Sequence, residues 1–151
     1  MLKTSSLCIV IFLLSCAKFD NDAQTIESIV KKYTTNEVAD KRLYLVTSLD
    51  GCGACLEYTV KFIENNISNP KMMFIVSGKS KIQLKNKFKR ATIKSPNFIF
   101  DTSIIALKNE LIGVVHPKVF LFKNQKIVED KEVNFVDAEK TFNEALAFVN
   151  Q

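Results

Sequence analysis

Two cysteines separated by two residues carry the most specific chemical signal in the sequence. Cys52 and Cys55 lie in the segment Asp-Gly-Cys-Gly-Ala-Cys, which directly follows a run of apolar residues. A thiol in the first turn of a helix has its thiolate stabilised by unpaired backbone N–H groups, which lower thiol pKa values to about 3.5–7.5 at such sites. A second thiol one turn later lies on the same face and can close a disulfide. The spacing predicts that Cys52 attacks a disulfide and that Cys55 resolves the mixed disulfide.

The same pair could also have a purely structural role. Cys52 and Cys55 could form an inert structural disulfide. A bridge that closes so short a loop stabilises the folded state little, so we favour the reactive interpretation.

The N-terminal segment predicts export. Lys3 precedes an apolar run over residues 7–14. This run is too short to span a bilayer, which needs about 20 residues. Its length and its positively charged flank are typical of a secretory signal peptide.

The end of the apolar run and the two residues after it resemble the bacterial lipobox, where signal peptidase cuts before a cysteine that carries lipid. The resemblance rests on Leu13, Ser15 and Cys16. It implies a lipoprotein signal peptide over residues 1–15, lipidation of Cys16 and a short tether over residues 16–21. Secretion without lipid and an uncleaved anchor are the alternatives. Cys8 would leave with the signal peptide and Cys16 would carry the lipid, so Cys52 and Cys55 are the two thiols that remain. Exported compartments are oxidising, so these two thiols form a disulfide there unless a partner reduces them.

The rest of the chain, residues 22–151, predicts one α/β domain in which strands alternate with helices. Its length suits a single core, and the 47% apolar and 25% charged residues of the full 151-residue sequence are typical of a folded protein. The patterns predict helices near residues 26–33, 53–69, 79–90 and 104–111 and from Asp137 onward, and strands over 42–48, 72–76, 97–100, 118–122 and 127–129. Gly113 is expected to cap the fourth helix, and the last two strands to pair as a hairpin.

A basic stretch over residues 79–90 stands apart from these elements. It could contact anionic lipid headgroups or nucleic acid. No aromatic residues or nucleic-acid motif accompany it in a pattern that would favour such binding, so we expect a solvated helix face and no nucleic-acid partner.

The order strand, Cys52-Gly53-Ala54-Cys55, helix and later a strand preceded by Pro117 resembles the thioredoxin-like fold family. The additional strand and helix over residues 97–112 resemble the bacterial membrane-tethered thiol–disulfide oxidoreductase lipoproteins of that family. The resemblance covers about residues 25–150. It implies a three-layer sandwich: a mixed sheet with a parallel part and an antiparallel C-terminal hairpin, and helices on both faces.

The resemblance also implies an activity and a site. Pro117 matches the family's cis-proline, whose neighbouring backbone holds the substrate chain, so Pro117 and His116 are expected to position the substrate beside Cys52 and Cys55. The implied function is thiol–disulfide oxidoreductase activity on Cys-containing exported proteins, at the extracytoplasmic, most simply periplasmic, side of a bacterial envelope membrane. A redox partner protein must restore the active state, and no organic cofactor is implied.

Two positions depart from the family pattern. Gly51 stands where Trp is common, and the chain has no Trp. The strand over residues 42–48 carries no acid to accept the proton of Cys55, and helix geometry is expected to point Glu57 elsewhere.

Three alternatives follow from the same residues. Pro117 could be an ordinary trans proline at the start of a strand. If His116 lies against the cysteine pair, the two thiolates and the imidazole would suit Cu(I) or Zn(II), which would make the protein a metal-binding or delivery protein. A binding module that has kept the fold and lost catalysis is the third.

Overall fold

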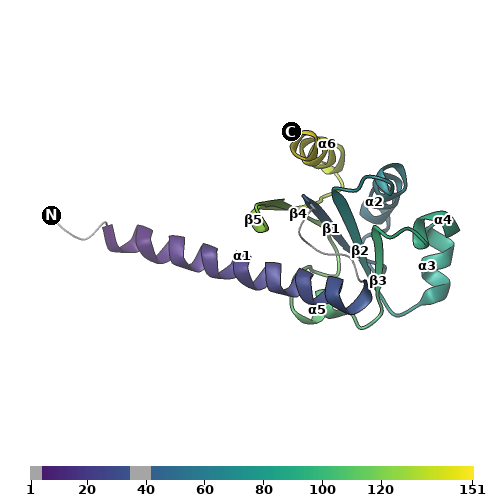
Figure 1. Ribbon diagram of the computed structural model, residues 1–151, viewed down its shortest axis with the longest axis horizontal. Coiled ribbons are helices and arrows are strands. Elements are labelled where there is room, and N and C mark those ends of the chain that lie inside the picture. Colours follow the sequence, from purple (N-terminus) through teal and green to yellow (C-terminus); the bar gives the residue numbers. More distant parts are fainter. Residues whose placement is uncertain (1–4, 35–41) are drawn as a thin grey trace.

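The structure of the protein, a computed structural model, describes residues 5–34 and 42–151, with side chains from residue 18 onward (Figure 1). The elements follow in the order α1 (Ser5–Tyr33), β1 (Leu43–Ser48), α2 (Gly53–Asn66), β2 (Met72–Ser77), α3 (Lys81–Lys87), α4 (Arg90–Ile93), β3 (Phe98–Asp101), α5 (Ile105–Lys108), β4 (Lys118–Lys123), β5 (Lys126–Glu132) and α6 (Ala138–Asn150). This is the predicted succession, except that the basic stretch forms two short helices in place of one.

The five strands form one mixed sheet in the order β3-β2-β1-β4-β5. Strands β1, β2 and β3 run parallel, β4 runs antiparallel to β1, and β5 runs antiparallel to β4. The hairpin between β4 and β5 turns at Asn124 and Gln125, which both have positive φ, as two-residue hairpin loops require. The predicted parallel part and antiparallel hairpin are confirmed, and β1 occupies the centre of the sheet.

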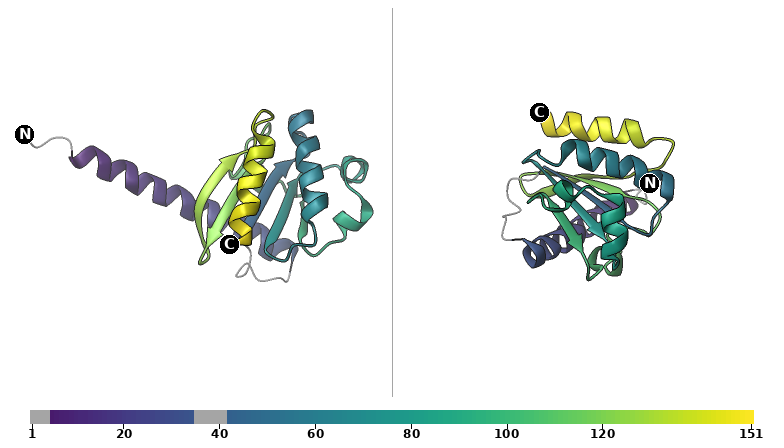
Figure 2. Two further views of the ribbon diagram at one scale, coloured as in Figure 1. Left: turned by 90° about the horizontal axis from the view of Figure 1, so that it is seen from above. Right: turned by 90° about the vertical axis from the view of Figure 1, so that its right-hand side faces the viewer.

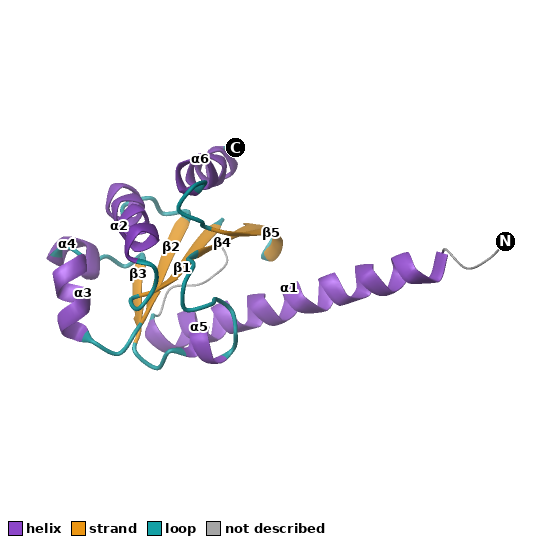
Figure 3. Ribbon diagram, turned by 180° about the vertical axis from the view of Figure 1, so that it is seen from behind, coloured by secondary structure: helices purple, strands orange, loops and turns teal. Residues whose placement is uncertain are grey.

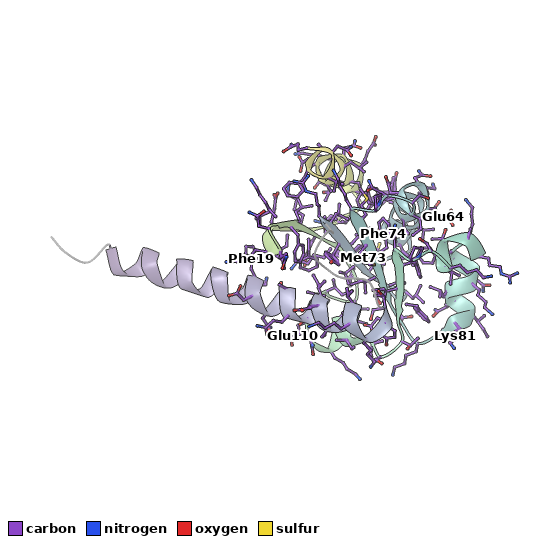
Figure 4. The ribbon with its side chains drawn as sticks, viewed as in Figure 1. Phe19, Glu64, Met73, Phe74, Lys81 and Glu110 are labelled. Carbon is purple, nitrogen blue, oxygen red and sulfur yellow. The ribbon has the colours of Figure 1, made fainter. Side chains whose placement is uncertain are left out.

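Helices cover both faces of the sheet, as Figure 2 shows: α2 and α6 lie on one face and α1 lies on the other. The side chains of β1 alternate between these layers. Leu43 and Leu45 pack in the core beneath α2 and α6, whereas Tyr44 and Val46 pack in the core beneath α1 and α5. On β2 the neighbours Phe74 and Met73 divide in the same way (Figure 4). The chain is a three-layer α/β sandwich, as the sequence predicts.

Helix α1 is longer than the predicted ten residues. Its C-terminal half packs on the sheet through the fully buried Ile26, Ile29 and Val30. Residues 16–21, which we expected to form a tether, have helical backbone within α1, and the N-terminal part of the helix extends past the sheet (Figure 1). The side chain of Cys16 lies outside the described residues. Within the described part of the chain, no helix combines the length and apolar character needed to cross a bilayer.

The prediction that Gly113 caps the helix before β4 is wrong. Helix α5 ends after Lys108, with Asn109 as its cap, and is drawn in Figure 3 as a single short turn. Beyond it Glu110 adopts φ 54°, and the Leu111 N–H donates to the carbonyl of Ala106 at 3.0 Å. A non-glycine residue takes the left-handed position, so the chain has turned before it reaches Gly113.

Candidate dithiol site

Cys52 is the N-cap residue of α2, in the loop that connects β1 to this helix. Its backbone is not helical (φ −52°, ψ 122°), but its carbonyl accepts the first helical hydrogen bond, from the Leu56 N–H at 2.8 Å. The central strand β1 ends at Ser48, and Leu49 and Asp50 form a turn before the helix begins. The side chain of Cys52 is partly exposed. The predicted position of this thiol, at the positive end of a helix, is confirmed.

Cys55 lies in the first turn of α2 and is buried, with 1% of its surface exposed. Both cysteines are free thiols in the structure, and their side chains are hydrogen-bonded to one another. The pair therefore combines one thiol that solvent reaches with one that the fold covers. A disulfide partner from outside can reach Cys52 before it can reach Cys55.

The surroundings shift the two thiol pKa values in opposite directions. The pKa of Cys52 is lowered chiefly by the backbone N–H of Cys55 and then by the Cys55 side chain; burial opposes these two effects, and the N–H of Ala54 adds the smallest decrease. The pKa of Cys55 is raised, mainly by burial and then by the hydrogen bond and charge of Cys52. The more exposed sulfur is thus the one that ionises first, as nucleophilic attack requires.

A second chain segment contacts this loop through its backbone. The Cys52 N–H donates to the carbonyl of Val115 at 3.1 Å. A Cβ atom on Gly51 would come within 3.1 Å of the Val114 carbonyl oxygen and 3.2 Å of the Val115 carbonyl oxygen. Gly51, which has no Cβ atom, lets the two backbones approach this closely.

This contact places the residues before β4 at the site, but the proline geometry differs from the expectation. The peptide bond before Pro117 is trans, so the identification of Pro117 as a cis-proline is wrong and the alternative of a trans proline at a strand start is confirmed. The trans form is the intrinsic preference of an X–Pro bond, by about 0.5–1 kcal/mol. Pro117 is buried directly before β4, and its carbonyl accepts from the Val133 N–H at 2.8 Å.

His116 is half-buried between Val115, which contacts Cys52, and Pro117. Its buried Nδ1 atom has no hydrogen-bond partner among the described residues. The structure brings the backbone of this segment to the cysteine pair through the bond between Val115 and Cys52.

Phe135 belongs to the site and was missed in the sequence. Its backbone N–H donates to the sulfur of Cys55, which partly offsets the increase in the Cys55 pKa. Its ring is 54% exposed and packs edge-on against Tyr58 of α2, with 5.7 Å between ring centroids. No local sequence pattern predicts the contact between Phe135 and Cys55, because the loop between β5 and α6 is distant from Cys55 in the chain.

Exposed apolar side chains surround the pair. Val114 and Val115 are about half exposed in the segment that contacts Gly51 and Cys52, and Tyr58 and Phe135 are about half exposed beside Cys55. We call these four residues the apolar rim. It offers apolar contact to a chain that approaches Cys52.

The expectation about Glu57 is confirmed. Its side chain is exposed and pairs with Lys61 at 3.3 Å, one turn along α2. The strand β1 supplies buried hydroxyls, Thr47 and Ser48, but no carboxylate. No carboxylate on β1 or α2 is therefore placed to take the proton of Cys55.

A buried charged cluster lies close to the site in the chain and was also missed. Lys118, the residue after Pro117, forms an ion pair with Asp130 of β5 and lies 3.9 Å from Asp22 of α1. Its ammonium group stacks over the Phe120 ring, 4.9 Å from the centroid, in the layer beneath α1. Burial raises the pKa of Asp22, and Lys118 acts against that increase. The cluster joins α1 to the hairpin of β4 and β5.

The metal-site alternative finds no support in this arrangement. Within the part of the chain that the structure describes, no three side chains of His, Cys, Asp or Glu lie together as a metal site would require. Cys52 and Cys55 supply two ligands, and His116 is not gathered with them into a third.

Comparisons with known proteins reach only solved structures. No profile of a protein family matches the sequence, and no curated protein matches it. A protein of Chlorobium tepidum assigned as a thiol:disulfide interchange protein DsbE is 14% identical, covers 74% of this chain and 82% of its own, and superimposes with a TM-score of 0.49. A peroxiredoxin-like protein of Aquifex aeolicus is 13% identical, covers 73% and 74%, and has a TM-score of 0.45.

The chain's own topology identifies its architecture. A central strand leads into the helix that begins at the cysteine pair, a parallel strand pairs on one side of it, and an antiparallel hairpin pairs on the other. A helix covers each face of this mixed sheet. The protein has a thioredoxin-like fold.

Proposed function

We propose that the protein is a thiol–disulfide oxidoreductase that acts through Cys52 and Cys55. The observation that carries the proposal is the division of the pair: Cys52 is partly exposed at the start of α2, whereas Cys55 is buried one turn away and hydrogen-bonded to it. An inert structural bridge gains nothing from an exposed sulfur with a lowered pKa, but exchange chemistry depends on one.

In the reduced form the Cys52 thiolate attacks one sulfur of a substrate disulfide. A bond forms between that sulfur and Cys52, and the other substrate sulfur leaves as a thiolate and takes up a proton. Cys55 then loses its proton and attacks Cys52, which releases the second substrate thiolate and leaves a Cys52–Cys55 disulfide. Two electrons pass to the substrate. The reverse sequence oxidises a substrate dithiol, and in either direction a redox partner protein must restore the starting state.

The finer parts of the proposal concern where the protein acts and on what. The signal-like N-terminus and Cys16 support a lipid-anchored protein on the extracytoplasmic side of a bacterial envelope membrane. Cys-containing exported proteins are the proposed substrates, with the apolar rim as their contact surface. The backbone of residues 114–117 supports a role for His116 and Pro117 in positioning the substrate, since Val115 is bonded to Cys52.

The test is a redox titration of the full chain in glutathione buffers, with thiols trapped at each step. A single reversible two-thiol transition between about −120 and −270 mV is expected for an exchange catalyst, and its position decides whether the protein tends to oxidise or to reduce. A pair that stays oxidised throughout would contradict the proposal and indicate a structural bridge.

A trapping experiment separates catalysis from simple binding. In Cys55→Ser the mixed disulfide between Cys52 and a substrate cannot be resolved, so it should accumulate on non-reducing gels, whereas Cys52→Ser should form none. If clients bind equally well to the Cys52→Ala and Cys55→Ala variants and no mixed disulfide is trapped, the protein is a binding module.

A further inference from the structure

A cavity of about 640 Å³ lies at the corner of the fold built by α3, α4 and β3, on the side of the molecule where Figure 4 labels Lys81. Its volume falls within the roughly 300–1,000 Å³ of small-molecule sites. None of the dithiol-site residues lines it. It is lined by Lys81, Leu84, Lys85, Phe88, Arg90, Ile93, Lys94 and Phe100.

The walls of the cavity are apolar. Leu84 comes from α3, Phe88 caps the end of that helix, Ile93 comes from α4 and Phe100 from β3. Phe88 is held in place by an edge-on contact with Phe98, at 5.2 Å between ring centroids. The split of the basic stretch into two helices creates this space, because the extended residue Phe88 ends α3 and turns its ring inward. An aliphatic chain in the cavity would be removed from water by carbon on several sides.

The rim of the cavity is cationic. Lys81 and Lys85 lie one turn apart on α3, and Arg90 and Lys94 lie one turn apart along α4, all four exposed. Like charges at this spacing repel one another. Among the described residues none of these four groups has a carboxylate partner, whereas the neighbouring Lys89, which does not line the cavity, pairs with Glu64 at 2.8 Å.

The excess of cations over carboxylates around the cavity follows from the sequence. Between Glu64 and Asp101 the chain contains no acidic residue at all. The same stretch contains Lys71, Lys79, Lys81, Lys85, Lys87, Lys89, Arg90 and Lys94. Four of these cations gather around an apolar cavity, which distinguishes this surface from an ordinary solvated helix face.

We propose that this cavity binds an anionic amphiphile with a single acyl chain, of the fatty-acid class. The chain would lie against Leu84, Phe88, Ile93 and Phe100, and the anionic head would lie among the rim cations. A wholly polar anion would leave the apolar walls unused, and a cationic amphiphile would be repelled by the rim. The proposal is independent of the dithiol chemistry, because the two sites share no residue.

The test follows the amide shifts and affinity of the ¹⁵N-labelled full chain during titration with dodecanoate below its micellar concentration. Dodecyltrimethylammonium, which has the same chain and the opposite charge, is the matched ligand control. Saturable shifts confined to α3, α4 and β3 are expected with dodecanoate, and these shifts should be absent with the cationic amphiphile. Added salt should weaken the binding, because it screens the rim.

Variants of equal net charge localise the effect. K81Q/K85Q removes two rim cations and should weaken dodecanoate binding roughly tenfold. K79Q/K87Q removes two exposed lysines from the same region that do not line the cavity, and it should change the affinity less than twofold. Ile93→Trp should fill the cavity and abolish binding. All variants share the N-terminal apolar segment, so any binding there is the same in each.

Several results would overturn the proposal. Absence of saturable dodecanoate binding would do so, as would equal weakening in the two lysine variants. Unchanged binding in a folded Ile93→Trp variant would place the ligand elsewhere. Binding to phosphatidylglycerol vesicles without binding of dodecanoate would assign the basic region to a bilayer surface rather than to a single amphiphile.

Discussion

The backbone N–H of Cys52 donates a 3.1 Å hydrogen bond to the carbonyl of Val115, two residues before Pro117. This bond fixes the start of α2 against the segment that leads into β4. The Val115 carbonyl accepts this bond, and the Cys52 side chain remains partly exposed. The residue that carries the nucleophile is therefore held by a backbone hydrogen bond from a distant part of the chain. A change in the distance between these two backbones should alter both the stability of the protein and the redox potential of the cysteine pair.

Gly51→Ala tests this backbone contact. The added Cβ would lie 3.1–3.2 Å from the carbonyl oxygens of Val114 and Val115, so one of the two segments must shift. We expect a loss of about 1–3 kcal/mol in the free energy of unfolding, measured by urea denaturation of the reduced protein. A change in the redox potential should accompany it, since Cys52 moves with the loop.

Gly53→Ala is the matched control for that variant. A Cβ atom on Gly53 meets nothing within 4 Å, and Gly53 is the first residue of α2. Alanine is favoured over glycine in helices, so this variant should be neutral or more stable by up to about 1 kcal/mol. Equal destabilisation by the two substitutions would show that the close backbone approach at Gly51 is not the cause of the lost stability.

The pH dependence of alkylation tests the opposite shifts of the two thiols. Only the thiolate reacts with iodoacetamide, so a lowered pKa moves the half-maximal rate of Cys52 below the ordinary thiol value near 9.0. The Cys55→Ser variant should retain most of this shift, because its largest cause is the backbone N–H of residue 55. In Cys52→Ser the half-maximal rate of Cys55 should lie above 9.0, since burial is the main cause of its raised pKa. The reverse order of the two thiols would refute the assigned roles.

The apolar rim should matter for protein substrates and not for small disulfides. Phe135→Ala removes the ring that packs on Tyr58 but keeps the backbone N–H that bonds Cys55. We expect KM for a protein disulfide to rise several-fold, with little change in the rate toward glutathione disulfide. Val128→Ala, at a valine of similar exposure on β5, is the control and should leave both rates unchanged. Parallel losses toward both substrates would mean that Phe135 acts on the thiols rather than on the substrate.

The sequence predicted those features that depend on local patterns. The position of Cys52 at the start of a helix follows from turn residues between an apolar run and a helical repeat, and the centre of the sheet follows from the unbroken apolar character of Leu43–Val46. The hairpin near Asn124 follows from its spacing. These features arise within short stretches of chain, so the residues themselves determine them.

The features that the sequence did not reveal depend on contacts between distant segments. The bond from Phe135 to Cys55 joins the loop before α6 to α2, and the Lys118 cluster joins β4 to α1. The peptide bond before Pro117 is trans, whereas the family resemblance implies the cis form. The cavity at α3 and α4 requires a helix break at Phe88, where the sequence shows one continuous basic stretch.

Lys118→Met tests the buried charged cluster. The substitution keeps the volume of the aliphatic stem but leaves Asp22 and Asp130 without their shared cation. Removing the cation leaves the buried Asp22 and the partly buried Asp130 unpaired, which costs about 3 kcal/mol, so the free energy of unfolding at pH 7 should fall by about that amount. The loss should shrink in acid, as the carboxylates become protonated. A variant that is as stable as the parent at pH 7 would show that the cluster contributes nothing net.

Asp22→Asn should have the opposite effect at neutral pH. Burial raises the pKa of Asp22 above its ordinary value near 3.8, so the folded protein holds this proton more tightly than the unfolded chain does. The resulting stability is fully present below pH 3.8 and is lost as the pH rises through the raised pKa. Asparagine imitates the protonated carboxyl, so the variant should be more stable than the parent at pH 7 and equal to it below pH 3.8.

Two controls make the Asp22 result specific. Asp20→Asn changes an exposed carboxyl two residues away on α1 and should leave the unfolding curves unchanged at both pH values. Asp130→Asn removes the close partner of Lys118 and should destabilise the protein at pH 7. If Asp22→Asn were also destabilising at pH 7, its 3.9 Å attraction to Lys118 would outweigh the cost of burying the carboxylate, and the cluster would be an ion triad rather than one pair with a carboxyl that burial disfavours.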